Sequence, residues 1–370
     1  MRNAIAAVLL VLLCAAALAQ PQAPAQPPAA PTGPEQPGKV LLELKFAPGE
    51  VLRYRGFADL TGTMNMAMTG APQQPQQPQQ PFNMQMMLGG KGNAAATARV
   101  VKTDPYGGAR LRVRLDNFAA ALDFMGQKIH MALKNGKLTM TANGKPIKQA
   151  GLPIMPAGKA LPLLQNPIEI KLGKRGQMMD IVIPGFEKEW KQMMAQAKQM
   201  YGGIDPMTIM RQGQILLPDH PIGVGEGWNH HVEVPLAGGA PVVMDMNFTL
   251  DNLETVNGKQ IATIGVTGRE TMTNIDLQTM MKQGMAQAGP QMRQMGQVPP
   301  ISGKMNGEFG ISGKARFNVT AGTLERYDFR ADLNFQMESS IPVGQAGQQR
   351  PMAMTANMVG QINGALARLQ

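Results

Sequence analysis

The chain has 370 residues with a formal net charge of +10, and its single cysteine lies at position 14. A mature chain that has lost its N-terminal segment therefore has no disulfide, no cysteine metal ligand and no thiol nucleophile, and its core must stabilise it. The positive charge is concentrated in residues 39–150, which contain 15 Lys and Arg against 6 Asp and Glu. In an exported chain this excess favours anionic envelope polymers or lipid headgroups as partners and argues against nucleic acid.

The N-terminus has the features of a secretory signal peptide. Arg2 precedes an apolar run that is too short to span a bilayer as a helix, and Ala17-Leu18-Ala19 fits the small-residue pattern of a cleavage site. We expect cleavage after Ala19 and a periplasmic or extracellular mature protein. Residues 20–38 are rich in Pro, Ala and Gln, which predicts a disordered tether.

From residue 39 onward the pattern is that of β-strands. Short segments with period-two alternation are separated by Gly, Pro, Asn and Asp, and Asn-Gly pairs at 135–136, 143–144 and 257–258 predict tight hairpins. We predict a mainly β (α+β) fold of antiparallel sheets, in which two weakly repeated β units form curved or packed sheets. The first unit spans 39–212, the second spans 213–345, and a C-terminal segment covers 346–370.

Two segments within this pattern have helical periodicity instead. A helix is expected near 186–201, with Trp190, Met193, Met194 and Met200 on one stripe, and Gly202-Gly203 ends it. A second short amphipathic helix is expected near 275–296 and contains Met281.

Methionines alternate on both sides of a Pro/Gln run at 70–81. The flanking segments predict a hairpin in which Met64, Met66 and Met68 share a face with Phe82, Met84 and Met86. Soft thioethers could bind Cu(I), form an apolar binding wall, or pack as ordinary core. Because the methionine excess is spread over strands and helices and this hairpin contains no His or Cys, the apolar wall is favoured. Its predicted residues are Met64, Met66, Met68, Met84, Met86, Trp190, Met193, Met194, Met200 and Met281.

A basic stripe is predicted on two strands. Arg110, Arg112 and Arg114 share one face of their strand, and Arg53 and Arg55 repeat the arrangement. The stripe is either the ordinary solvated face of a sheet or a site for anionic groups.

Neither a metal site nor a catalytic site is predicted. Three histidines, His220, His230 and His231, lie near several carboxylates, but adjacent strand residues point to opposite faces, so His230 and His231 cannot easily share a metal. The sequence has no G-x-S-x-G motif, P-loop, dinucleotide-binding glycine motif or H-E-x-x-H motif. We therefore expect a protein that is not an enzyme and that has no cofactor.

Three segments carry a resemblance to a known group. Phe46–Glu50, Leu217–Trp228 and Gly313–Leu324, placed after a signal peptide and a Pro-rich tether, resemble uncharacterised secreted or lipid-anchored bacterial envelope proteins. The architecture is also distantly similar to lipoprotein-carrier half-barrels, in which a curved sheet closed by helices holds acyl chains. The resemblance implies a β-rich envelope protein and assigns no catalytic residue.

The leading hypothesis is a non-enzymatic envelope protein that binds a lipid or apolar peptide on a methionine-lined sheet. The alternatives are a scaffolding protein that acts through protein–protein contact, and periplasmic copper binding through the methionine clusters. The sequence indicates neither the ligand nor the oligomeric state.

Overall fold

The computed structural model describes residues 38–69, 82–124, 126–134, 137–146, 166–200, 216–234, 242–278, 302–343 and 350–369. This part of the chain is mainly antiparallel β, as the sequence predicts. The first strands in chain order are β1 (Lys39–Val40), β2 (Val51–Thr69), β3 (Phe82–Thr103), β4 (Ala109–Phe124), β5 (Gln127–Lys134), β6 (Lys137–Ala142), β7 (Lys145–Pro146), β8 (Ile168–Leu172) and β9 (Met178–Val182). After helix α3 (Glu187–Met200) follow β10 (Ile222–Gly223), β11 (Gly227–Val234), β12 (Val242–Val256), β13 (Lys259–Asp276), β14 (Ser302–Asn318), β15 (Thr323–Val343) and β16 (Arg350–Leu369).

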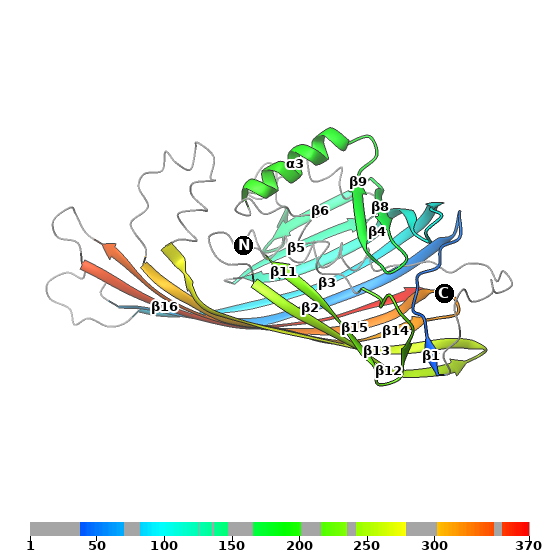
Figure 1. The fold of residues 1–370 in the computed structure, drawn as a ribbon. Coiled ribbons are helices and arrows are strands. Elements are labelled where there is room, and N and C mark those ends of the chain that lie inside the picture. The colour runs from blue at the N-terminus through cyan, green and yellow to red at the C-terminus, as the bar shows by residue number, and fades with distance from the viewer. Residues whose placement is uncertain are drawn as a thin grey trace.

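Most of these strands belong to one 14-stranded sheet, whose order is β11-β12-β13-β14-β15-β16-β2-β3-β4-β5-β6-β7. Strand β8 branches from β4 and pairs with β9, while β1 and β10 form a separate two-stranded sheet. The two predicted β units are joined into a single curved layer (Figure 1), because β16 pairs with β2 from Ala353↔Thr69 to Leu369↔Arg53.

Two of the three predicted Asn-Gly turns are confirmed. Asn143 and Gly144 have φ of 50° and 78°, and Asn257 and Gly258 have φ of 51° and 74°. Positive φ at both central residues is the requirement of a type I′ turn, whose twist matches that of the flanking strands. The pair at 135–136 lies outside the described residues.

The main strands are longer than the sequence suggested. Strand β2 has 19 residues and β3 has 22, and both continue through glycines that resembled strand ends. Gly62, for example, is paired with Gly360 on one side and Leu88 on the other. A glycine within a strand therefore marks a close backbone approach here, and not a turn. Conversely, only Lys39 and Val40 of the apolar segment 39–46 form a strand, which is β1.

The core lies on one side of the sheet, which we call the inner face and define by Leu52 and Tyr54 of β2. Both side chains are almost fully buried, under Leu42 and Leu44 of the segment after β1 and under β8 and β9. Tyr54 Oη donates a hydrogen bond of 3.2 Å to the carbonyl of Leu324. The opposite side, which carries Arg53 and Arg55, is the outer face.

Trp228 is a second anchor of this core. Its ring stacks on Phe248 with the centroids 5.3 Å apart, and its Nε1 donates to the carbonyl of Leu216 at 2.6 Å. A large apolar ring with a satisfied polar atom is well suited to such a half-buried position.

Helix α3 agrees with the expected helix near 186–201 and lies on the same side of the sheet as β8 and β9 (Figure 1). Glu187 and Glu189 lie in its first turn, where a carboxylate interacts favourably with the helix dipole. The helix expected near 275–296 differs at its start, because β13 continues to Asp276, and the range 279–296 lies outside the described residues. No helix in the described ranges is both long and apolar enough to cross a membrane.

The pairing of β16 with β2 can be tested through Leu366, which is 4% exposed and lies between Gly56 and Tyr327 in the sheet. We expect Leu366→Ala to lower the free energy of unfolding by about 2–4 kcal/mol, since it leaves a cavity where the two halves meet. Val359→Ala, on the same strand but 50% exposed, should change it by less than about 0.5 kcal/mol. Urea unfolding followed by circular dichroism measures both, and equal effects would contradict this role of β16.

Candidate functional site

The inner face of the sheet continues past the covered core into an area dominated by methionine. In antiparallel pairing, residues directly opposite each other point to the same side. One row across the strands runs Met86, Met64, Met358, Phe335, Gly307, Met272, and the next runs Met84, Met66, Ala356, Met337, Met305. A third row contains Met68, Met354 and Ser339. We call the methionines and Phe335 of these rows the methionine face.

The methionine face is partly open to solvent. Met86 is 8% exposed and belongs to neither buried core cluster, and the other methionines of these rows are half-buried. None of the residues in the three rows is charged. Six neighbouring strands at about 4.8 Å per strand make this face roughly 24 Å wide. An uncharged, half-open surface of this width, continuous with the core, is suited to an apolar ligand.

Glycine on this face makes room for a larger neighbour. A Cβ built on Gly307 would overlap the ring of Phe335 and lie 3.1 Å from the terminal methyl of Met272. The Phe335 ring therefore occupies the space above Gly307. The face is thus packed in part by its own side chains, and thioethers adapt well to such irregular surroundings.

Ser339 is the exception to the apolar chemistry of these rows. It is 7% exposed, and its Oγ has no hydrogen-bond partner within the described ranges. A buried hydroxyl without a partner costs stability. Ser339 therefore contributes a buried hydroxyl group at the border of the methionine face.

The sequence prediction for the hairpin is confirmed, with Met64↔Met86, Met66↔Met84 and Met68↔Phe82 paired. Two further predicted wall residues lie elsewhere. Trp190 and Met194 pack against the main core cluster. The side chains of Met193 and Met200, as well as Met281, lie outside the described residues.

Sequence reasoning missed half of the methionine face, namely Met272, Met305, Met337, Met354 and Met358. The alternation MAMTANM at 352–358 is the same signal as in the hairpin, but no strand is predicted within 346–370. One partner of this strand, β2, is distant in sequence, and the other, β15, is separated from it by residues 344–349. The register of the strand therefore cannot be derived from the sequence.

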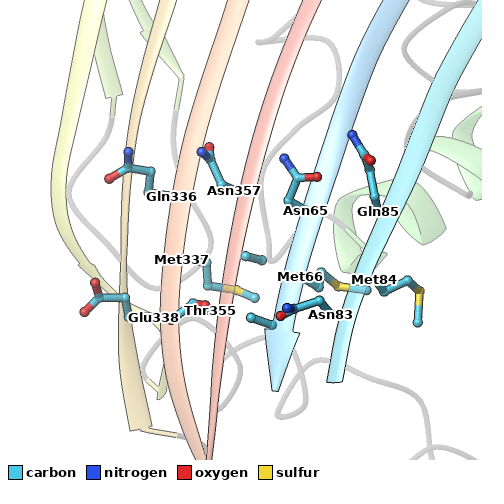
Figure 2. A pocket seen from close by; sticks show the side chains of 12 residues that line it. Asn65, Met66, Asn83, Met84, Gln85, Gln336, Met337, Glu338, Thr355 and Asn357 are labelled. Carbon is cyan, nitrogen blue, oxygen red and sulfur yellow. The ribbon is translucent and has the colours of Figure 1, made fainter. Parts of the chain in front are cut away.

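The outer face over the same strands is mainly polar, with Lys304 opposite Glu338 and with Met87 and Val359 exposed on it. Figure 2 shows Gln336, Asn357, Asn65 and Gln85 in one row across four neighbouring strands, in agreement with their register. A shallow groove of about 480 Å³ lies between this row and the next, which contains Asn83, Thr355 and Glu338. At these two rows the outer face therefore carries mainly amide and hydroxyl groups, whereas the inner face carries thioethers.

The predicted basic stripe lies on the outer face at the other end of the strands. Arg112 Nη2 contacts Glu169 Oε1 at 2.6 Å, and Arg110 Nη1 lies 3.5 Å from Oε2 of the same carboxylate, which is 8% exposed. Arg114 is paired with Asp116 at 2.9 Å. Arg53 and Arg55 are exposed and have no ion-pair partner in the described ranges. The five arginines thus differ in how much charge they offer to a ligand.

The histidines are dispersed. His230 faces the inner side opposite Met246, whereas His231 faces outward and lies 2.5 Å from Asp245 Oδ1. His220 Nδ1 is 2.9 Å from Asp219 Oδ1. Burial lowers the pKa of His230, with smaller effects of His231 and Arg175 in the same direction. Within the described ranges, no three His, Cys, Asp or Glu side chains are grouped to hold a metal ion.

Among the described carboxylates, Glu50 has the largest shift in pKa. It follows Gly49 at the start of β2, where its Oε2 accepts a bond of 3.3 Å from the amide of Ala47, while Oε1 is buried with no partner in the described residues. Burial raises the pKa of Glu50 to about 7, against the opposing effects of the Ala47 amide and of Arg368. Glu50 therefore changes its charge near neutral pH.

Comparison with known proteins gives only distant similarity. No family model and no curated protein matches the chain. Among solved structures, the outer membrane protein OprG from Pseudomonas aeruginosa is 8% identical, with 89% of this chain and 99% of that chain covered and a TM-score of 0.21. OccK7 (OpdD) from the same organism is 6% identical, with coverages of 86% and 100% and a TM-score of 0.18. A beta-barrel-like protein of the domain of unknown function DUF1849 from Brucella abortus is 8% identical, with coverages of 86% and 98% and a TM-score of 0.15.

The raised pKa of Glu50 predicts a specific pH dependence of stability. The pKa of Glu50 is about 7 in the folded chain and 4.5 at its ordinary value. At a pH between these two values the folded chain holds a proton that the unfolded chain has released. The free energy of unfolding therefore falls as the pH rises through this window. Glu50→Gln should remove this component and make the protein relatively more stable at pH 8. Urea unfolding at pH 5, 6, 7 and 8 measures it, and an identical pH profile for both proteins would refute the assignment.

Proposed function

We propose that this protein is a non-enzymatic protein of the bacterial cell envelope that binds a lipid acyl chain on the methionine face. The single observation that carries this proposal is the gathering of uncharged, half-buried methionines from β2, β3 and β13–β16 on one side of an open sheet. The signal-peptide features of residues 1–19 support the envelope location.

The choice of an acyl chain rests on the chemistry of the side chains. Methionine is flexible and polarizable and adapts to ligands of variable shape, which a rigid pocket of branched or aromatic residues does not. The three rows offer no charge and only the hydroxyl of Ser339 as a polar group. Binding would therefore depend on burial of apolar surface, for which a flexible hydrocarbon chain is the simplest partner.

The proposal predicts that Met66→Ser combined with Met84→Ser weakens the binding of an apolar probe. These half-buried residues are directly paired (Figure 2), and the change puts two polar hydroxyls into the wall. We expect an affinity loss of about 10- to 100-fold for N-phenyl-1-naphthylamine, measured by its fluorescence, and for fatty acid in competition with it.

The matched control is Met87→Ser combined with Val359→Ser. These residues lie on the outer face and are 75% and 50% exposed, so probe binding should stay within about twofold. Equal losses in both double variants, or no binding of probe or fatty acid by the unaltered protein, would reject the proposal. The second of these results would favour a scaffolding role through protein contact.

Copper binding is a second candidate, because the structure brings thioethers closer together than the hairpin alone implied. Met64 is directly opposite both Met86 and Met358, and Met68 is opposite Met354. Adjacent thioethers are ligands suited to Cu(I). Met64→Leu combined with Met86→Leu should abolish Cu(I) binding in competition with a chelator, yet leave probe binding within about threefold, because leucine conserves the apolar surface. Unchanged Cu(I) affinity would exclude a copper site at these residues.

A further inference from the structure

A second surface of the protein is lined mainly by cations, in contrast to the uncharged methionine face. A pocket of about 910 Å³ opens where β2 and β13 begin, β15 begins and β14 and β16 end, far along the strands from the methionine face. We call it the arginine pocket. Its lining consists of Val51, Arg53, Lys259, Arg316, Glu325, Arg326, Ala367, Arg368 and Leu369.

The pocket carries an excess of positive charge. Glu325 is the one acidic residue among its lining, against four arginines and Lys259. This carboxylate is directed to another partner, because its Oε1 accepts a hydrogen bond of 3.0 Å from Asn318 Nδ2, and Asn318 is 1% exposed. Glu325 keeps its negative charge, and the four arginines and Lys259 still leave the lining residues with a net charge of +4.

A β-bulge shapes this arrangement. The register between β14 and β15 shifts between Arg316↔Arg326 and Phe317↔Leu324, so that Glu325 is the extra residue. Bulges re-aim side chains at the edges of binding sites. Here the bulge moves Glu325 out of the cross-strand pattern and leaves Arg316 directly opposite Arg326.

Two like charges directly opposite each other destabilise a sheet. Arg326 is compensated by Asp328, with bonds of 2.6 and 2.8 Å, whereas Arg316 has a single long contact of 3.4 Å with Glu254. Arg316 therefore keeps donors for a further acceptor. Arg368 is oriented in a similar way by one bond of 3.4 Å to the hydroxyl of Thr323, which is fully buried.

Arg53 and Lys259 are the two cations of the pocket with neither an ion pair nor a side-chain hydrogen bond in the described ranges. Both are exposed at the start of their strands. Arg53 is also the one member of the predicted basic stripe that lines this pocket. The donors that remain for a ligand thus come from Arg53, Lys259 and Arg316, with Arg368 at the border.

We propose that the arginine pocket binds a phosphate group. Guanidinium groups bind phosphate oxygens through paired hydrogen bonds, and a lysine adds a point charge. A phosphate offers several acceptor oxygens and up to two negative charges, more than a single carboxylate can offer, to the cations that line this pocket from different strands. The phosphate belongs either to a small soluble phosphoester or to the headgroup of an anionic lipid.

The test uses the full purified chain and three probes, namely inorganic phosphate, glycerol 3-phosphate, and vesicles of phosphatidylglycerol compared with phosphatidylcholine. Calorimetry measures the soluble probes and flotation measures the vesicles. The variant Arg53→Gln combined with Lys259→Gln should weaken binding roughly 10- to 100-fold, because charged hydrogen bonds are lost. Lys91→Gln combined with Lys304→Gln removes the same charge elsewhere and should change affinity by less than about threefold.

The outcomes separate the two sources of phosphate. Binding of glycerol 3-phosphate without vesicle binding assigns a soluble ligand, and binding of phosphatidylglycerol vesicles alone assigns a lipid headgroup. No binding of any probe, or equal losses in the two double variants, would overturn the proposal. Because inorganic phosphate has no apolar part, its binding to the arginine pocket is independent of whether the methionine face binds an acyl chain.

Discussion

The structure depends on the antiparallel pairing of β16 with β2. This pairing joins the last described strand to the first long one and so unites two β meanders in one sheet. The paired residues run from Ala353↔Thr69 to Leu369↔Arg53 and are therefore about 300 positions apart in sequence. Because side chains alternate strictly along a strand, the register also fixes which face each residue occupies in both halves. A slip of one residue between these strands would place Met358 opposite Thr63 or Asn65, which belong to the outer face.

The same sheet supports two different surfaces. Toward one end its inner face is covered by the segment after β1, by β8 and β9 and by α3, and becomes the main core. Toward the other end the inner face keeps its apolar side chains, but they are only half-buried, and flexible thioethers replace the branched and aromatic residues of the core. At the rim beside the core, strand ends collect cations that are far apart in sequence. An apolar face and a cationic pocket are therefore consequences of one topology.

Several local features could be predicted from the sequence because they are encoded within a few residues. The Asn143-Gly144 and Asn257-Gly258 turns, the helix ending near Met200 and the pairing of Met64 with Met86 all depend on short-range patterns. The sequence predicts shorter strands because glycines such as Gly62 resemble strand boundaries, although pairing with Gly360 and Leu88 keeps Gly62 within the sheet. Trp190 was grouped with the methionine wall, yet it packs on the core.

The sequence by itself determined the β class, the alternation of apolar and polar residues, the local hairpins and the charge of the first half, because each depends on composition or on neighbours along the chain. Only the tertiary structure decided that Met272, Met305, Met337, Met354 and Met358 share a face with the hairpin methionines. It also decided that Arg53, Lys259 and Arg316 share a pocket. The physical reason is that cross-strand register between distant segments arises from the packing of the whole sheet, and no local pattern records it.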